Sequence, residues 1–545
     1  MSQRSGRVAQ GLLVTLAIVA GWRWWWTCDD AFISFRYAER LTQGLGLSFN
    51  DGEWVEGYTN FLWTLWVALG KLLGVDEENW SNSAGLLSYA GLVWALSRPS
   101  DRRRWPLAAV LVVASRPMQI WATGGLETAA NLGLLALGFF AALPSVGTVS
   151  YRRNAAAGLA FAAAALTRPD SALVAGVCGL AALWRESAVP EGRPQRSLRG
   201  LRRVWPMAAG FLVIWLPALL WRKVTYGDWV PNTYYAKSGS LAWWSQGWVY
   251  LKLVFLECPW FPLGLALGWR ASAADVSRAE RARQLGAWFS ALLFTVYVTK
   301  VGGGFMHCRL ALPGVLFSFI ALEASLAGYA LTLLPKSAHR WAALATVGLV
   351  CLSWPTALGP TETVSGVIDE RAHYDPARAK RLERDAAQIR PFVQGLNLRV
   401  AFIGGQARLV HRLAPPVAIE AETGLTDAWV ARQQLPQRGR VGHEKRAPAS
   451  YLVEQRRTHM VFGAFAFKYL GLNGYIPRVG VKMGNSWAFL LSWDAKIVEA
   501  LRRRGATIPP FGKRARELLA NPNLIPAPQR AATLSKIRRF WPSAP

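Results

Sequence analysis

The sequence predicts a polytopic α-helical membrane protein with about eleven transmembrane helices and a C-terminal domain of mixed α/β structure. Three observations predict this class. Of the 545 residues, 52% are hydrophobic and only 17% are charged, which is too apolar for an ordinary soluble chain. Apolar stretches close to bilayer length recur up to residue 356. Beyond it, 357–545 alternates short strand-like runs with helical ones.

The strong positive charge does not indicate a nucleic-acid-binding protein. Lys and Arg total 62 against 33 acidic residues, which gives a net charge of +29, but the basic residues are interleaved with apolar runs. The run Trp24–Trp26 ends an apolar segment and is typical of the aromatic belt at a membrane interface. The five cysteines, none of them in 357–545, exclude a disulfide-built module.

The first transmembrane helix is expected at 8–26, because a basic start precedes it and no small-residue cleavage site follows. Ten further spans are expected at 80–97, 105–121, 125–143, 154–166, 171–185, 205–222, 248–269, 284–299, 310–332 and 341–356.

The loops between these spans support a cytoplasmic N-terminus, because short cytoplasmic loops carry an excess of Lys and Arg. With this orientation the basic residues of the inner loops are Arg98, Arg102–Arg104, Arg152, Arg153, Arg185, Arg193, Arg196, Arg199, Arg202, Arg203, Arg270, Arg278, Arg281, Arg283, Lys336 and Arg340. An odd number of spans then sends 357–545 outside, where its charge of +16 (30 basic minus 14 acidic residues) faces anionic headgroups or an acidic glycan.

Two domains follow from this layout. Residues 1–356 form the transmembrane domain, whose long first outer loop, 27–79, contains an apolar juxtamembrane helix at 61–74. Residues 357–545 form an extracytoplasmic domain with strands near 400–403 and 487–491 and helices near 376–390 and 495–504. That domain is long enough to fold separately.

Two adjacent acids, Asp29 and Asp30, begin the first outer loop at the membrane boundary. Adjacent carboxylates raise each other's pKa, so one of them can act as a general base near neutral pH. A solvated pair that ends a span is the alternative. A divalent cation is a further candidate partner of Asp29 and Asp30, since two carboxylates and water suffice to bind a hard metal ion.

Other polar residues are expected on the same outer face. Glu127 starts the fourth span, Arg168 lies in the turn between the fifth and sixth, Lys237 follows the seventh, and His307 and Arg309 lie between the ninth and tenth. The first outer loop adds Arg36, Glu56, Tyr58 and Asn60. Arg and Lys donors at the mouth of a membrane cavity suit a phosphate with a lipid tail. Taken singly, each charge is more often a residue that sets topology.

Several kinds of site are not indicated. The run Gly302-Gly303-Gly304 lacks the Lys-Ser/Thr of a P-loop and the setting of a dinucleotide-binding turn. Six scattered histidines without a Cys-x-x-Cys pair argue against a structural zinc site, so no metal ligand is assigned. Cys28 and Cys308 both fall on the outer face, and in an oxidising compartment a disulfide between them is a hypothesis.

Eight segments in order resemble the GT-C class of polytopic glycosyltransferases, and they are most similar to the terminal β-(1→2)-arabinofuranosyltransferase family. They are 29–60, GGLET at 124–128, TRPD at 167–170, 226–237, GGGFMHCR at 302–309, 365–374, 424–432 and GHEK at 442–445. The resemblance implies a bacterial plasma-membrane enzyme with a polyprenyl-phosphate sugar as donor and an envelope glycan as acceptor. It also implies that the active site and the C-terminal domain are extracytoplasmic.

The resemblance implies roles for particular residues. The catalytic base falls on Asp29 or Asp30 and a second outer acid on Glu127, while Arg168, Lys237 and Arg309 hold the donor phosphate with Arg36 and His307 as helpers. The family commonly has an acid where this chain has Gly303. This departure leaves open the transfer of another sugar to lipopolysaccharide, capsule or protein. A lipid or polysaccharide transporter is the rival from another class, although the sequence has no repeated halves with broken helices.

Overall fold

The computed structural model describes residues 3–98, 106–145, 149–187, 193–237, 241–270, 276–326, 363–435, 437–476, 478–525 and 527–540. The chain forms two compact units. The first unit comprises Met1–Cys28, Thr59–Trp229 and Leu241–His373, and the second comprises Asp29–Tyr58, Val230–Ser240 and Tyr374–Pro545. The second unit therefore contains two short segments, Asp29–Tyr58 and Val230–Ser240, that interrupt the first unit in the sequence.

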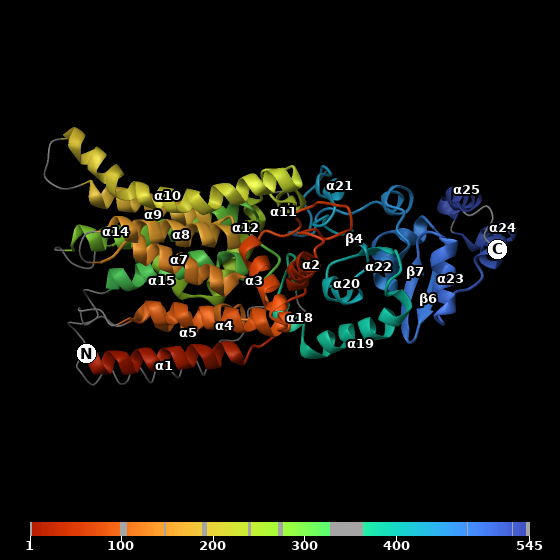
Figure 1. Ribbon diagram of the computed structural model, residues 1–545, viewed down its shortest axis with the longest axis horizontal. Helices are drawn as coiled ribbons and strands as arrows, with labels where there is room; N and C mark the ends of the chain where they lie inside the picture. Colours follow the sequence, from red (N-terminus) through yellow and green to blue (C-terminus); the bar gives the residue numbers. More distant parts are fainter. Residues whose placement is uncertain are drawn as a thin grey trace. The chain divides into compact units, whose positions relative to one another are not determined.

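The first unit is a bundle of helices. Within it α8 packs against α7 and α10, and α14 packs against α9 and α15 (Figure 1). The helices are α1 Gln3–Trp22, α3 Phe61–Leu72, α4 Glu77–Leu96, α5 Leu107–Ala114, α6 Arg116–Ile120, α7 Thr128–Ala142, α8 Tyr151–Thr167, α9 Ser171–Glu186, α10 Arg193–Tyr226, α12 Trp244–Glu257, α13 Trp260–Leu267, α14 Arg278–Lys300, α15 Leu312–Leu326 and α18 Glu370–His373. A short hairpin of β1 Thr363–Val364 and β2 Val367–Ile368 accompanies them.

Helices lie at ten of the eleven expected spans, and the eleventh, 341–356, lies outside the described residues. Two of the stretches are interrupted. Stretch 105–121 breaks at Ser115, which takes an extended conformation two residues before Pro117, because proline lacks the N–H that continues a helix. Stretch 248–269 bends by 104° between α12 and α13, where Pro259 follows Cys258.

By length and composition, two helices of the described part, Gly200–Tyr226 and Arg309–Leu326, can cross a membrane alone, and the bent pair adds a third if it is one span. The count of eleven therefore stays a prediction.

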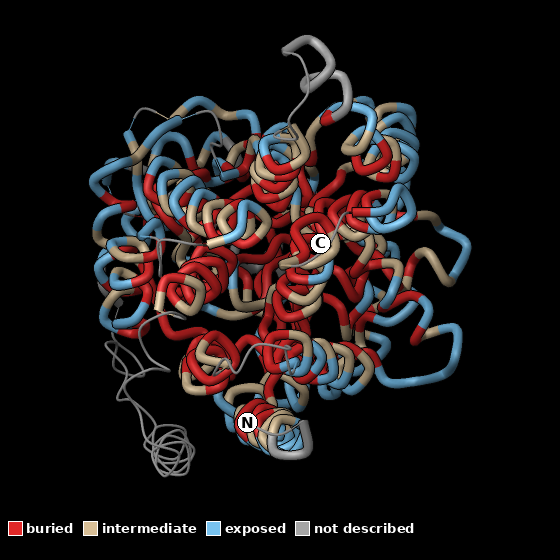
Figure 2. Tube along the Cα trace, turned by 90° about the vertical axis from the view of Figure 1, so that its left-hand side faces the viewer, coloured by how far each residue is buried: buried red, intermediate tan, exposed pale blue. Residues whose placement is uncertain are grey.

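The outside of the bundle is apolar, as a lipid-facing surface should be. On α10, Leu212, Val213, Leu216 and Leu220 are each more than two-fifths exposed. Figure 2 views the bundle nearly end-on, with buried residues concentrated toward its middle and exposed residues around its rim. A large surface of exposed leucine and valine is unfavourable in water and favourable against lipid tails. This surface is therefore that of a membrane protein.

The second unit contains a five-stranded mixed sheet in the order β4-β3-β5-β7-β6. Strand β3 pairs in parallel with both β4 and β5, while β7 runs antiparallel to β5 and β6. The strands are β3 Arg399–Phe402, β4 Val417–Glu420, β5 Met460–Phe462, β6 Val479–Met483 and β7 Ser486–Leu490. The helices include α2 Ala31–Thr42, α11 Asn232–Ala236, α19 Pro376–Val393, α20 Ala407–Leu413, α21 Ala428–Ala431, α22 Ala464–Tyr469, α23 Ala495–Arg503, α24 Phe511–Ala520 and α25 Arg530–Phe540. The strands and helices expected at 400–403, 487–491, 376–390 and 495–504 are confirmed.

Hydrogen bonds to backbone groups join the early segments to the C-terminal part of the second unit. The N–H of Asp51 donates to the carbonyl of Pro416, and the N–H of Ala418 in β4 donates to Asn50 Oδ1. Asn232 donates from its side-chain nitrogen to the carbonyl oxygens of Gly424 and Leu425 at 2.8 and 2.9 Å. Because buried backbone groups need partners, these contacts make both segments integral parts of the unit.

Candidate functional site

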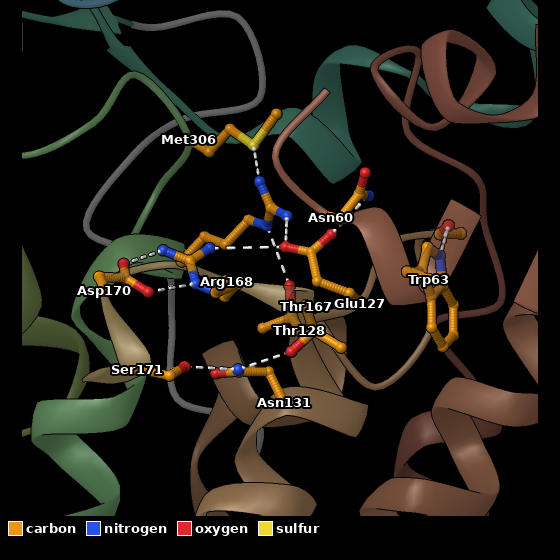
Figure 3. A network of polar contacts seen from close by, with 12 residues as sticks. Asn60, Trp63, Glu127, Thr128, Asn131, Thr167, Arg168, Asp170, Ser171 and Met306 are labelled. Carbon is orange, nitrogen blue, oxygen red and sulfur yellow. Dashed lines mark hydrogen bonds and ion pairs between the residues drawn. The ribbon is translucent and has the colours of Figure 1, made fainter. Parts of the chain in front are cut away.

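Glu127 joins three parts of the first unit through one buried carboxylate. Gly124 and Gly125 have φ of 94° and 75°, conformations that favour glycine, and this turn places Glu127 just before α7. Its carboxylate accepts hydrogen bonds from Arg309 Nη2 at 2.6 Å and from Asn60 Nδ2 at 3.0 Å (Figure 3). The structure therefore brings together three of the residues that the sequence singled out.

Arg168 belongs to the same network. Its Nη1 lies 3.6 Å from Glu127 Oε1, and its Nε and Nη2 donate to the two oxygens of Asp170 at 3.2 and 2.6 Å. The side chains of Arg168 and Arg309 are only 12% and 15% exposed. Two acids thus balance two buried guanidinium groups, as burial of charge requires.

Arg309 retains one nitrogen with only a weak partner. Its Nε donates to Thr128 Oγ1 at 2.9 Å and its Nη2 to Glu127. Its Nη1 faces Met306 Sδ at 3.2 Å, and a thioether sulfur is a weak acceptor. This nitrogen is therefore the donor of the network best able to take an additional anionic oxygen.

Asn131, one turn along α7 from Glu127, fixes the helix ends that carry the network. Its side-chain nitrogen lies 3.0 Å from the Ala164 carbonyl, 2.8 Å from Thr167 Oγ1 and 2.7 Å from Ser171 Oγ (Figure 3). It thereby ties α7 to the end of α8 and the start of α9. Asn131 was not singled out from the sequence, although a polar side chain inside the apolar stretch 125–143 was the signal for it.

His307 does not join the Glu127 network. Its Nε2 lies 3.8 Å from Glu257 Oε1 on α12, and its backbone N–H donates to Ile368. Burial lowers the pKa of His307 to about 4. The imidazole is therefore neutral near pH 7 and adds no positive charge for a phosphate.

Asp29, in the second unit, caps a distant helix. Its two carboxylate oxygens accept the N–H groups of Ala407 and Arg408 at 2.9 and 3.0 Å, at the start of α20, where Gln406 makes no side-chain cap. Burial raises the pKa of Asp29 to about 6, a larger effect than the neighbouring charge of Asp30. The charge of Asp30, which the sequence suggested as the reason for a raised pKa of Asp29, is thus a smaller cause than burial.

Each oxygen of Asp29 already accepts one backbone N–H, and a divalent cation at Asp29 and Asp30 stays a prediction. Among the described residues, no group of three or more His, Cys, Asp and Glu is placed to hold a metal ion.

Asp30 differs from its neighbour. It precedes α2, is half-buried, and its side chain makes no cap hydrogen bond. Within the part of the chain that the structure describes, its carboxylate has no hydrogen bond or ion pair. Of the two acids, Asp30 is therefore the one whose carboxylate oxygens are not already held by backbone N–H groups.

The remaining candidates lie in the second unit and are mostly structural. The buried Arg36 guanidinium donates to the carbonyls of Phe49 and Pro415, which leaves it poorly placed to hold a phosphate. Tyr58 is buried with its ring edge-on to Tyr37 at 4.7 Å, and the Glu56 carbonyl accepts the N–H of Asn232. Lys237, just after α11, is exposed.

Gly303, the position at which the resemblance implies an acid, has no free space beside it. Its φ is 72°, and a Cβ added there would lie 2.3 Å from Cγ of Tyr250. The Tyr250 hydroxyl donates to the carbonyl of Met306 and accepts the N–H of Leu310, at 3.2 and 3.0 Å. Because residue 303 has no side chain, the Tyr250 ring fits beside it, and the Tyr250 hydroxyl can bond to the backbone on both sides of Arg309.

Gly303→Ala should lower the thermal stability of the protein, because alanine would be strained at this φ and would meet the Tyr250 ring. We expect a loss of at least about 1 kcal/mol, measured by thermal unfolding in detergent. Gly304→Ala is the matched control, since its added Cβ would meet nothing closer than 3.7 Å. Equal Tm values for the two variants would contradict the account of Tyr250.

The hypothesised disulfide between Cys28 and Cys308 is not formed. Both are buried free thiols, as are Cys178 and Cys258. Cys28 Sγ lies 3.9 Å from Glu370 Oε2.

Solved structures establish the class of the fold. ArnT from Cupriavidus metallidurans bound to undecaprenyl phosphate superposes with a TM-score of 0.54 at 15% identity, over 91% of this chain and 99% of that chain. Its apo state gives a TM-score of 0.51 at 16% identity. The protein therefore has the GT-C fold.

Two characterised proteins are similar in sequence, while no protein-family model matches the chain. The terminal β-(1→2)-arabinofuranosyltransferase of Mycobacterium tuberculosis is 30% identical over 437 residues, 68% of this chain and 66% of the relative. The enzyme of the same name from Corynebacterium glutamicum is 28% identical over 349 residues, 54% of this chain and 47% of the relative. The chain thus spans just under two thirds and about half of these relatives' lengths. It is a relative of the terminal β-(1→2)-arabinofuranosyltransferases.

Proposed function

We propose that this protein transfers a sugar, with arabinofuranose favoured, from a polyprenyl-phosphate donor to an envelope glycan with inversion at the anomeric carbon. The names of the two sequence relatives support the sugar. The undecaprenyl phosphate bound to ArnT supports a polyprenyl-phosphate lipid. Decaprenyl-phosphate arabinose is the donor we favour.

The observation that carries the proposal is the pair of buried arginines held by Glu127. A donor phosphate needs fixed cationic donors where charge develops on the leaving group. Arg309 supplies Nη1, whose present partner is a sulfur atom, and Arg168 reinforces the positive charge. Because the Glu127 carboxylate is buried and already bonded to Arg309 and Asn60, we assign it a positioning role.

Asp30 is our choice for the general base. Its carboxylate takes the proton of the acceptor hydroxyl while the hydroxyl oxygen bonds to the anomeric carbon. The bond between that carbon and the phosphate oxygen breaks, and its electron pair leaves with the polyprenyl phosphate. Inversion needs only this one base, because the leaving phosphate requires no general acid when cations stabilise it.

The proposal includes a location and a role for the C-terminal domain. We place the protein in a bacterial plasma membrane, with a cytoplasmic N-terminus and with the site and the second unit outside. The second unit then holds the acceptor glycan. The partners are the donor lipid, the acceptor and the bilayer, without nucleic acid.

A membrane-fraction assay with radiolabelled decaprenyl-phosphoryl arabinose and an arabinofuranose oligosaccharide acceptor tests the function. We expect a labelled product one sugar longer than the acceptor. Extension only with another polyprenyl-phosphate sugar would overturn the choice of arabinose and favour a hexosyl or other transfer, as the glycine at 303 allows. Movement of lipid across liposomes without any glycosidic product would favour the transporter instead.

A further inference from the structure

The second unit contains a pocket that none of the roles above uses. Its volume is about 410 Å³, within the range of small-molecule sites. Three chain segments form it, namely 453–459, which begins within the helical turn Tyr451–Gln455, 475–476 before β6, and 491–494 between β7 and α23.

The floor of the pocket is apolar and its sides are aromatic. Val453, Ile476 and Leu491 are buried in the core of the unit, while Tyr475 and Trp493 are half-buried in the lining. The Arg502 guanidinium lies 5.6 Å from the centre of the Trp493 ring and helps to fix it. Flat aromatic faces beside apolar carbons suit the C–H surfaces of sugar rings, which stack on aromatic side chains.

Two polar groups of the lining are held in fixed orientations. His459 Nδ1 accepts the N–H of Arg399 at 3.0 Å, so its Nε2 carries the proton, 3.8 Å from Asp494 Oδ2. The other Asp494 oxygen accepts the N–H groups of Lys496 and Ile497 at the start of α23. An immobilised donor beside an immobilised acceptor is what recognition of a hydroxyl group requires, since a hydroxyl both donates and accepts.

The charge of the pocket selects against anions. Glu454 and Asp494 contribute two negative charges and Arg457 one positive charge, and burial lowers the pKa of His459, which keeps that ring neutral near pH 7. Residues 357–545 as a whole carry +16. A pocket with a slight excess of acid in so basic a region is poorly suited to phosphate and well suited to a neutral polyhydroxylated ligand.

The backbone on one side of the pocket is unusual. Tyr451–Gln455 forms a π-helical turn, and Arg457 has φ of 48°, a left-handed conformation that costs free energy in a residue other than glycine. Such turns and such residues concentrate at functional sites, where the strain places side chains for binding. Here they aim Glu454 and Arg457 at the pocket that both residues line.

We propose that this pocket binds a neutral oligosaccharide segment of the acceptor glycan, away from the sugar that reacts. The choice of ligand rests on the proposed function. The pocket adds a specific location to it, with Trp493 and Tyr475 stacking on sugar rings and with Glu454, Arg457, His459 and Asp494 bonding their hydroxyl groups.

The test is calorimetric binding of a neutral arabinofuranose hexasaccharide to the full-length protein in nanodiscs. Trp493→Ala and Glu454→Gln should each weaken binding at least about tenfold, which corresponds to about 1.4 kcal/mol. Trp487→Ala is the matched control, because Trp487 lies on β7 and is 50% exposed but does not line the pocket. Unchanged affinity in both pocket variants, or displacement of the sugar by inorganic phosphate, would overturn the proposal.

The same experiment separates this inference from the proposed function. If the wild type binds the hexasaccharide through the pocket but transfers no sugar, the pocket assignment holds and the transferase proposal fails. If it transfers arabinose while both pocket variants bind normally, the pocket assignment alone fails.

Discussion

Asp30→Asn should reduce sugar transfer at least about 100-fold, because a positioned general base contributes about 10²–10⁴-fold to rate. The amide cannot accept the proton of the acceptor hydroxyl. Stability should change little, since the Asp30 side chain does not cap α2 and makes no hydrogen bond or ion pair among the described residues. Initial rates with saturating donor, together with the Tm of the same preparation, measure both effects.

Asp29→Asn is the matched control, with the opposite pattern. An asparagine accepts one of the N–H groups of Ala407 and Arg408 but turns its own NH₂ toward the other, which costs about 1–3 kcal/mol. We expect a lower Tm and a nearly normal turnover per folded molecule. Loss of transfer in Asp29→Asn together with full transfer in Asp30→Asn would reverse the assignment of the base.

Glu127→Gln should be among the most destabilising single changes in the first unit. The change removes the negative charge that pairs with both Arg309 and Arg168. The Glu127 side chain is only 3% exposed, so water cannot replace this charge. Breaking a buried ion pair from one side costs about 3–5 kcal/mol. We expect a large fall in Tm, measured by tryptophan fluorescence on heating, and a raised KM for the donor lipid.

Glu499→Gln provides the reference for removing a charge without burial. Glu499 pairs with Arg503 at 3.7 Å on α23, and both side chains are more than half exposed. Exposed pairs contribute about 0–1 kcal/mol, so this variant should unfold close to the wild type. If Glu127→Gln were as stable as Glu499→Gln, the claim that the buried Glu127 carboxylate stabilises the first unit through Arg309 and Arg168 would be wrong.

Much of the fold was predictable because apolar periodicity and length are local signals. The helices of the first unit lie where apolar stretches do, and the strands at 400–403 and 487–491 follow short β-branched and aromatic runs. The breaks at Ser115 and Cys258 were not predicted, although Pro117 and Pro259 were in the sequence. A proline does not always break a helix, since α10 continues through Pro206 and Pro217. The positions of the two breaks therefore could not be read from the prolines alone.

The candidate site was predictable in composition but not in its contacts. Glu127, Arg168, Arg309 and Asn60 were chosen for being polar on one face, and they do meet. The sequence could not separate Asp29 from Asp30, because the difference lies in backbone N–H groups 378 and 379 positions from Asp29. Nor could it reveal that Arg36 is occupied by two carbonyl oxygens.

The capping of α20 by Asp29 has a consequence for how the protein is made. The segment Asp29–Tyr58 emerges early from the ribosome, yet the strand edge and helix end that it completes come from the last third of the chain. During synthesis its polar groups stay without these partners until Ala407, Arg408 and Ala418 have been made. Assembly of the second unit is therefore a late, long-range event, of the kind that slows folding. A stop codon before residue 374 would leave the early segment without its partners, so truncation would damage both ends of the chain.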